Sequence, residues 1–529
     1  MSSAGWLRFG HHIDEWGTAV AVGMPVADLN GHMVILGTTN SGKSTLLRNL
    51  VLQYFGLGGT VVLLEPHGDL VLDRTDGLLA ALAPVQMGAV TLIDLDQGAN
   101  GWPTAFNLVS AGLAAGREVA VSQTMQSIHA MEDANWQMAV RMREILENSL
   151  HLLLDVQGET ASLVALHRFL VDGGFRQEIM EAASPSVQLM NDWWERHLEQ
   201  WRDPKRRESL ADILEPAERR VLGFLRNQQL RRGVALPSLA AEQALNLERR
   251  LNRPHPHLML LLLRNPATKR LYGTLFMQQL AALFQRRGRL PRAERRPLLV
   301  IIDEFPDLAG SELGSIVSML LAQARKFGAA LCLSAQSLMQ LPQAVQVEVK
   351  NNTSSKIILR TAGEEDAAIG VANLGSAALR PSHLMNVEPF HGYARTTVGG
   401  AVQPPFYLRT LPAVRFQPDL SQFRAPETLP PSGTESEALS QAGLRLAYRQ
   451  LTAAGAEALL ADLVRLDGES FQALVTAQVA ASRAAAQRLL TDESLEPDPV
   501  QRVRLISRAQ HGLPWWLYEA HYRRLRLGR

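Results

Sequence analysis

Residues 37–45 read GTTNSGKST, a spacing in which two glycines and a Lys–Ser pair could bind a chain of phosphates. Glycines let consecutive backbone N–H groups turn towards phosphate oxygens, and a helix that starts here adds the positive end of its dipole. Lys43 can reach the β- and γ-phosphates, and the Ser44 hydroxyl can bind Mg²⁺. A glycine-rich turn with a capping serine is the alternative, but it leaves the lysine unexplained. The predicted nucleotide-binding residues are Gly37, Thr38, Thr39, Asn40, Ser41, Gly42, Lys43, Ser44 and Thr45.

Two carboxylates follow a buried apolar run in the segment LLVIIDEF. Asp303 lies at the tip of the predicted strand, where it can hold the water shell of a Mg²⁺ ion. Glu304 comes next, where it can orient and polarise an attacking water, and an acid in this place favours hydrolysis over phosphate transfer. Asp303 could instead cap a following helix, although that interpretation explains only one of the two carboxylates. We therefore predict ATP and Mg²⁺ as ligands, Ser44 and Asp303 as metal ligands, and Lys43 and Glu304 as catalytic residues.

The segment ARKFGAALCLSAQS at 324–337 places an arginine and a glutamine on either side of a short apolar strand. The residues before that strand have helical spacing, and Arg325 falls at the edge of the apolar stripe. It can reach out to complete the site of a neighbouring subunit, or remain solvated at the end of its helix. Gln336 ends the strand, level with Asp303 if the two strands are neighbours, where it can contact the γ-phosphate and the attacking water. Arg360, at the end of KIILR, is a second candidate arginine.

The segment LLEPHGDL at 63–70 ends another apolar run. Glu65 could join the Mg²⁺ shell, and His67 and Asp69 could contact the nucleotide or a neighbouring subunit. The residue types alone also fit a Pro–Gly turn in which Asp69 caps a helix. Both interpretations stay open on these residues.

These side chains need a parallel sheet to bring them together. Short apolar runs at 32–37, 60–65 and 89–94 end in glycine or an acid, and a stretch with helical spacing separates the first two. Strand–helix–strand units with short links predict an α/β fold with a central, mostly parallel sheet. The expected domains are a small β-rich lead-in at 1–30, a discontinuous P-loop ATPase domain at 31–112 and 290–412, a helical insert at 113–289, and a Pro-rich linker with a C-terminal helical extension at 413–529.

The composition is that of an ordinary globular protein, with 46% hydrophobic residues, 20% charged residues and a net charge of +1 over 529 residues. This charge gives no global attraction to nucleic acid, so any polyanion site must be local. Of the 53 basic residues 47 are arginine, which suits phosphate binding but also follows from a GC-rich genome. The single cysteine, Cys332, fits a reducing compartment. We see no signal peptide and no membrane-spanning run, so we expect a cytoplasmic protein that a partner could recruit to the inner membrane.

Taken together, these residues resemble the HerA–FtsK superfamily of hexameric motor ATPases, and more narrowly the type IV coupling proteins of bacterial conjugation and their soluble relatives. The resemblance implies a RecA-like ATPase domain, an all-α domain at the helical insert, a homo-hexamer and DNA as partner. It also implies a relaxosome, a secretion channel or a nuclease as candidate partners. It implies that Arg325 acts across a subunit boundary, and it favours a functional role for Glu65 and His67. The stretches that carry it, in the order of the family, are DLNGHMVILGTTNSGKST, LLEPHGDL, PTAFNL at 103–108, PLLVIIDEFPDL, ARKFGAALCLSAQSLMQL, NNTSSKIILRTAGEEDA and PFYLRTLP at 405–412.

The sequence departs from the family in three places. Asn40 stands where a glycine is usual, a change we expect to be tolerated because asparagine accepts positive φ. Glu65 stands where an aspartate is usual. Most coupling proteins carry an N-terminal membrane anchor, and we recognise none here, which puts a role at a secretion pore in doubt.

Three functions fit these observations. The leading hypothesis is an ATP-driven, ring-forming DNA translocase that grips the phosphate backbone without reading sequence. The alternatives are a secretion motor that acts on protein substrates and a nucleotide-gated scaffold with little turnover, against which the Asp303–Glu304 pair argues. Candidate DNA-contacting segments are the basic stretches at 202–209, 230–233 and 284–297, although such a stretch is more often a solvated loop.

Overall fold

The computed structural model describes most of the chain and divides it into two compact units. The first unit comprises residues 1–94, 246–428 and 489–507, and the second comprises residues 95–245, 429–488 and 508–529. The described residues are 5–13, 17–94, 106–129, 139–201, 208–237, 239, 247–266, 268–308, 311–423 and 453–527.

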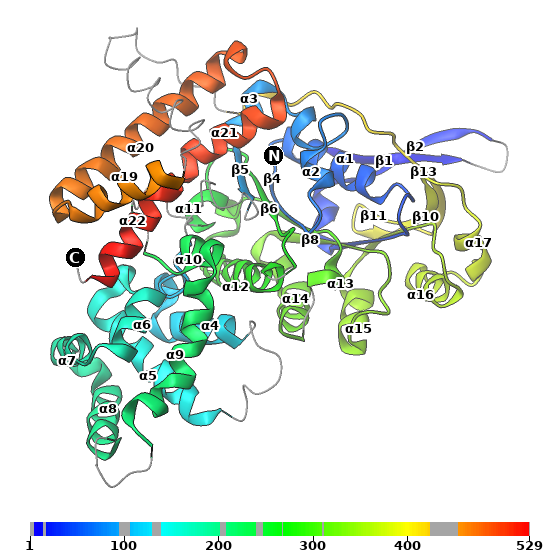
Figure 1. Ribbon diagram of the computed structural model, residues 1–529. Helices are drawn as coiled ribbons and strands as arrows, with labels where there is room; N and C mark the ends of the chain where they lie inside the picture. The colour runs from blue at the N-terminus through cyan, green and yellow to red at the C-terminus, as the bar shows by residue number, and fades with distance from the viewer. Residues whose placement is uncertain are drawn as a thin grey trace. The chain divides into compact units, whose positions relative to one another are not determined.

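One sheet, with eleven strands in the described residues, forms the centre of the first unit (Figure 1). From β9 to β5 neighbouring strands are parallel, and from β9 back to β2 they are antiparallel. In spatial order the strands are β2 (Ala19–Pro25), β1 (Trp6–Ile13), β13 (Phe406–Thr410), β10 (His391–Arg395), β9 (Ser355–Leu359), β3 (Met33–Leu36), β8 (Ala329–Ala335), β7 (Leu298–Ile302), β4 (Thr60–Glu65), β6 (Leu258–Leu262) and β5 (Val90–Asp94). A separate small hairpin joins β11 (Thr397–Val398) to β12 (Ala401–Val402).

The parallel strands are buried along their whole length, which explains their continuous apolar sequences. Every residue of β3 to β9 is buried. Because successive side chains on a strand point to opposite faces, helices or other elements must cover both faces of this part of the sheet. The predicted α/β fold with a mostly parallel central sheet is confirmed.

The first unit includes residues that the sequence placed in other domains. The run LMLLLL forms β6, which lies between β4 and β5, although it falls within the expected helical insert at 113–289. Such a short apolar run has no periodicity, so its sequence alone does not distinguish a buried strand from a buried helix segment. The expected lead-in at 1–30 likewise supplies β1 and β2, which extend the same sheet beyond β13.

The helices of the first unit include two that matter for the site, α1 and α14. Helix α1 begins at Lys43 directly after the phosphate loop, and α14 ends just before the strand that leads to Gln336. These helices are α1 (Lys43–Gly56), α2 (Asp69–Leu72), α3 (Pro84–Met87), α11 (Leu247–Leu251), α12 (Lys269–Arg287), α13 (Phe305–Leu308), α14 (Ser311–Gln323), α15 (Gln343–Asn352), α16 (Glu364–Leu374) and α17 (Pro381–Met385).

The second unit is helical in its described residues. A buried Trp194 packs edge-on against Phe169 in its core, 5.3 Å between ring centroids, and a capping box of Ser209 and Asp212 starts α9. Its helices are α4 (Arg117–His129), α5 (Val140–Gln157), α6 (Leu163–Val171), α7 (Gly173–Ala182), α8 (Gln188–Trp201), α9 (Leu210–Arg226), α10 (Gln228–Val234), α19 (Ala453–Arg465), α22 (Trp515–Arg526) and most of α20 (Gly468–Thr491), while most of α21 (Pro499–His511) lies in the first unit.

Ion pairs and a cation–π contact join the C-terminal helix α22 to α10 of the expected insert. Glu519 accepts a 2.8 Å hydrogen bond from Arg231 of α10, and Arg232 lies 3.6 Å from the same carboxylate. The guanidinium of Arg232 also stacks over Trp515, 4.6 Å from the ring centroid. The helical insert and the last helix of the chain therefore share one core.

No described helix has both the length and the apolar character that crossing a lipid bilayer would require.

Candidate functional site

The phosphate loop runs between β3 and α1 and takes the conformation that its glycines and asparagine allow. Gly42 has φ +100° and Asn40 has φ +62°, so the asparagine adopts the left-handed conformation expected of it. Hydrogen bonds from Gly37 N to Ala335 O (3.2 Å) and from Thr38 N to Arg360 O (2.9 Å) anchor the loop to the ends of the two neighbouring strands. The first N–H groups of α1 have no acceptor within the helix, so they can bind a phosphate.

The side chains of the loop divide between its exposed mouth and its buried base. Thr39, Asn40 and Ser44 are exposed, Thr38 and Thr45 are half-buried, and Gly37, Ser41, Gly42 and Lys43 are buried. The Ser41 hydroxyl is buried without a hydrogen-bond partner. Ser44 therefore presents its hydroxyl to solvent at the start of α1, where a metal ion could reach it.

Lys43 and Glu304 are in direct contact. Lys43 Nζ donates a 2.8 Å hydrogen bond to Glu304 Oε2, and both side chains are about one-tenth exposed. Glu304 has φ +43°, a conformation that non-glycine residues seldom adopt and that is often found at functional sites. Its other oxygen, Oε1, accepts the backbone N–H of Gln336 at 3.2 Å. One carboxylate thus joins the phosphate loop to the end of β8.

Gln336 lies where the sequence placed it, at the end of β8 and beside the end of β7. Its side chain is exposed, and its Oε1 accepts the Thr39 hydroxyl at 3.4 Å. Strands β3, β8 and β7 are parallel neighbours, so Gly37, Gln336 and Asp303 meet at the same edge of the sheet.

Asp303 is buried at the end of β7 and is oriented by a residue that the sequence reasoning missed. Ser334 Oγ donates a 2.8 Å hydrogen bond to Asp303 Oδ1, and the backbone N–H of Glu304 donates a 3.0 Å bond to the same oxygen. A lone serine inside the apolar run of β8, two residues before Gln336, is the signal that could have indicated Ser334. Both of these hydrogen bonds use the same carboxylate oxygen of Asp303, Oδ1.

Glu65 lies at the end of β4, next to Asp303. Its Oε1 accepts the backbone N–H groups of His67 and Gly68, and its Oε2 is buried without a hydrogen-bond partner. Burial raises the pKa of Glu65 to about 7, against the opposing effect of the Gly68 N–H bond. His67 is exposed at the same edge. Both residues therefore lie at the edge of the sheet that carries the phosphate loop.

The two candidate arginines lie at opposite edges of the sheet. Arg360 follows β9, is half-buried, and its carbonyl accepts Thr38 of the phosphate loop. Arg325 is exposed in the 3-10 turn Ala324–Phe327 before β8 begins. Because β8 has seven residues, Arg325 is separated from its own phosphate loop by roughly 20 Å of strand, at about 3.3 Å per residue.

Most of the described basic residues in the candidate DNA-contacting segments serve the fold. Arg231 and Arg232 bind Glu519, and Arg287 is buried. Arg295 donates to the carbonyls of Leu290 and Gly288, and Arg296 donates to that of Gly58, each at 2.9 Å. Residues 202–207 lie outside the described part of the chain. These described guanidinium groups already bind carboxylates or carbonyls, so they are not available to bind a phosphate backbone.

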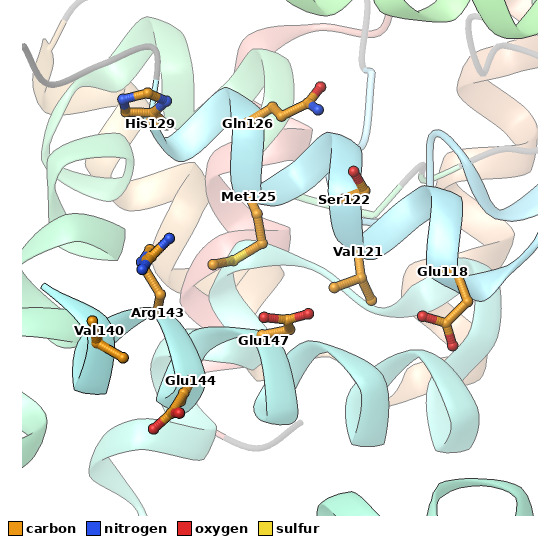
Figure 2. Close-up of a pocket in the computed structure, with 10 residues that line it drawn as sticks. All are labelled: Glu118, Val121, Ser122, Met125, Gln126, His129, Val140, Arg143, Glu144 and Glu147. Carbon is orange, nitrogen blue, oxygen red and sulfur yellow. The ribbon is translucent and has the colours of Figure 1, made fainter. Parts of the chain in front are cut away.

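A pocket in the second unit is unsuited to nucleotide. It lies between α4 and α5, and its lining includes three glutamates, Glu118, Glu144 and Glu147 (Figure 2). Three carboxylates in one lining disfavour a polyanion.

Two family models match the chain in the first unit and around the site. Residues 7–85 match the central domain of the helicase HerA, and residues 259–389 match the DNA-binding domain of the type IV secretion-system coupling proteins. These two matches relate segments of the chain to the HerA/FtsK-type ATPases and to the type IV coupling proteins. The two matches cover the phosphate loop, the Asp303–Glu304 pair, Gln336 and Arg325. The resemblance predicted from the sequence is thus confirmed.

Several solved structures are similar to this chain at low sequence identity. The bacterial conjugative coupling protein TrwBdeltaN70, in an unbound form, is 15% identical, with 78% of this chain and 91% of that chain covered and a TM-score of 0.45. The plasmid coupling protein TrwB in complex with ADP and Mg²⁺ is 16% identical, with 80% and 98% covered and a TM-score of 0.47. VirB4 of Thermoanaerobacter pseudethanolicus is 12% identical, with 78% and 98% covered and a TM-score of 0.47. None of the curated proteins matches the sequence.

Proposed function

We propose that this chain is an ATP-hydrolysing motor that assembles into a ring, a homo-hexamer, and moves DNA by contacts with its phosphate backbone. The observation that carries the hydrolytic part is the Glu304 carboxylate, which contacts both Lys43 and the backbone of Gln336. The match to a coupling-protein DNA-binding domain supports DNA as the substrate that is moved. A relaxosome, a secretion channel or a nuclease would be the partner that receives or delivers this DNA.

The oxygen atoms at the edge of the sheet fit a Mg²⁺ ion that is shared with nucleotide phosphates. Ser44 offers an exposed hydroxyl, Asp303 a carboxylate with one oxygen in use, and Glu65 an oxygen that is buried without a partner. Hard oxygen ligands are those that Mg²⁺ prefers. Ser44 and Asp303 would hold the ion, which when bound neutralises charge on the phosphates. The described residues contain no group of three His, Cys, Asp or Glu side chains that would hold a metal alone, in keeping with a shared ion.

The residues of the chain would then act in sequence. Lys43 exchanges Glu304 for the β- and γ-phosphates, because the phosphate chain offers more negative charge than one carboxylate. Glu304, released from Lys43, accepts a proton from the attacking water. Gln336, at the end of β8, would sense the γ-phosphate and transmit its presence to the loop that follows β8. Arg360, whose carbonyl accepts Thr38 of the phosphate loop, would contact the nucleotide in the same subunit.

A ring is proposed because Arg325 cannot serve the site of its own subunit. It lies before β8, whereas the phosphate loop lies after β3 at the other edge of the sheet. An exposed arginine in that place is suited to the phosphates of a neighbouring copy, where it stabilises the charge of the transition state.

The deciding experiment measures ATP hydrolysis with and without DNA, at several salt concentrations, together with the mass of the assembly. We expect DNA to stimulate hydrolysis by an oligomer, any DNA sequence to serve, and the stimulation to weaken as salt rises. Lys43→Ala, which removes the phosphate contact, is the inactive control. Hydrolysis that ignores DNA but responds to a partner protein would favour the protein motor, and nucleotide binding without turnover would favour the scaffold.

A further inference from the structure

Phe390 is a partly exposed aromatic residue beside the phosphate loop. Its side chain is 43% exposed, and its backbone has φ +65°. Its N–H donates a 2.8 Å hydrogen bond to Ser41 O in the loop, and its carbonyl accepts Thr410 N at 2.8 Å and Thr410 Oγ1 at 3.1 Å. The surrounding structure thus holds a bulky residue in a conformation that such residues rarely adopt, a feature that concentrates at ligand sites.

The ring of Phe390 lies directly against the glycine that precedes Lys43. A Cβ atom added to Gly42 would stand 2.6 Å from Cδ1 and 3.2 Å from Cε1 of the ring. The absence of a side chain at Gly42 therefore makes room for the ring as well as for the positive φ of the loop. Phe390 and the phosphate loop therefore line the same site.

The order of the strands indicates which end of a nucleotide meets Phe390. Glu304 and Gln336, which would face the terminal phosphate, follow β7 and β8 on one side of β3. Strands β9 and β10 lie on the other side of β3, and Phe390 directly precedes β10. A phosphate chain that runs across the loop from the Glu304 side places its nucleoside on the Phe390 side.

We propose that Phe390 is the platform on which the base of the bound nucleotide stacks. This inference rests on the proposed use of a nucleoside triphosphate at the loop. Stacking on an aromatic ring is favourable and tolerates every base, because each base has a π face. The site should therefore accept adenine and guanine nucleotides with affinities that differ by only a few-fold.

The test compares ATP with inorganic tripolyphosphate, which keeps the phosphates but has no base. We expect Phe390→Ala to weaken ATP binding by about 5- to 150-fold, the range found when a stacking aromatic is removed. Tripolyphosphate binding should stay within two-fold of wild type, and Trp6→Ala, which removes an exposed aromatic on β1, should change neither. In Phe390→Trp, ATP should bind normally and change the emission of that tryptophan, whereas tripolyphosphate should not.

Two outcomes would overturn the assignment. The first is unchanged ATP affinity in Phe390→Ala, and a change in assembly mass alongside it would make Phe390 a contact between subunits. The second is an equal loss for ATP and tripolyphosphate, which would mean that the variant distorts the loop. Failure of both ligands to bind the wild-type protein would instead count against the proposed function.

Discussion

Lys43 Nζ lies 2.8 Å from Glu304 Oε2, so the first residue of α1 is bonded to a residue 261 positions later in the chain. In this arrangement each charge is neutralised by the other, and both side chains are nearly withdrawn from water. An incoming phosphate competes with Glu304 for the lysine. In the proposed mechanism, nucleotide binding and release of the Glu304 carboxylate would therefore be the same event.

Glu304→Gln should trap ATP. We expect turnover to fall by roughly 10²- to 10⁴-fold, because glutamine cannot take the proton of the attacking water. ATP affinity should be equal to that of wild type or higher, because the neutral amide competes less well for Lys43. Turnover and ATP affinity are measured side by side, with the exposed Glu294→Gln as matched control. Near-normal hydrolysis in Glu304→Gln would remove Glu304 from the mechanism.

Arg325→Ala and Lys43→Ala should each be inactive alone and recover activity when mixed. Arginine fingers contribute roughly 10³–10⁵ in rate. In a random equal mixture about a quarter of the subunit boundaries pair an intact Lys43 with an intact Arg325. The measurement is ATP turnover across mixing ratios, in samples whose mass shows that they have assembled. Lys326→Ala, which alters the adjacent exposed cation, should behave as wild type, and complete absence of rescue in assembled mixtures would show that Arg325 does not act in trans.

Asn40→Gly should be tolerated and Asn40→Val should not. The φ of +62° at this position suits glycine, whereas a β-branched residue pays about 1–2 kcal/mol to adopt it. We expect the glycine variant to keep the wild-type free energy of unfolding and ATP affinity. In the valine variant both quantities should be lower. Denaturant unfolding and equilibrium binding check the two quantities. Equal ATP affinity in the two variants would mean that the loop conformation at Asn40 does not matter for binding.

His32 should make the protein less stable in acid. Its Nδ1 accepts Leu331 N and its Nε2 donates to Leu321 O, both at 3.1 Å, so the ring must be neutral. Burial lowers the pKa of His32 to about 4, with a smaller contribution from the charge of Arg325. An unfolded histidine, with its pKa near 6.5, binds a proton first, so the free energy of unfolding falls as the pH drops from about 6.5 towards 4. This histidine alone would contribute up to roughly 3 kcal/mol of that loss.

The check is urea unfolding of wild type and His32→Gln between pH 8 and pH 5. The variant should be less stable at pH 8, because the glutamine fits both hydrogen bonds poorly, but its stability should fall less steeply with acid. His383→Gln, which alters an exposed histidine, should keep the wild-type slope. An unchanged slope in His32→Gln would contradict the role of His32.

Part of the fold was predictable because its signals are local. The apolar runs of β3, β4 and β7 are too short and too continuous to be amphipathic helices, and each ends in glycine or an acid. The run that forms β6 has the same character, yet it stands among helical segments, and only the sheet shows which strands it joins. Ser334 and Phe390 were missed for a related reason, since the contacts of Ser334 with Asp303 and of Phe390 with Gly42 join residues far apart in the chain.

The chemical groups of the candidate site could be predicted from the amino-acid order, because the spacing of glycines, lysine and serine around residue 43 and the acid pair after a buried run are local to the chain. How these groups meet depends on the folding of the sheet. Parallel pairing brings the ends of β3, β8 and β7 to one edge, which joins Lys43 to Glu304, and sends Arg325 to the other. Strand order depends on how the whole sheet buries its apolar surface, and that is a property no single segment encodes.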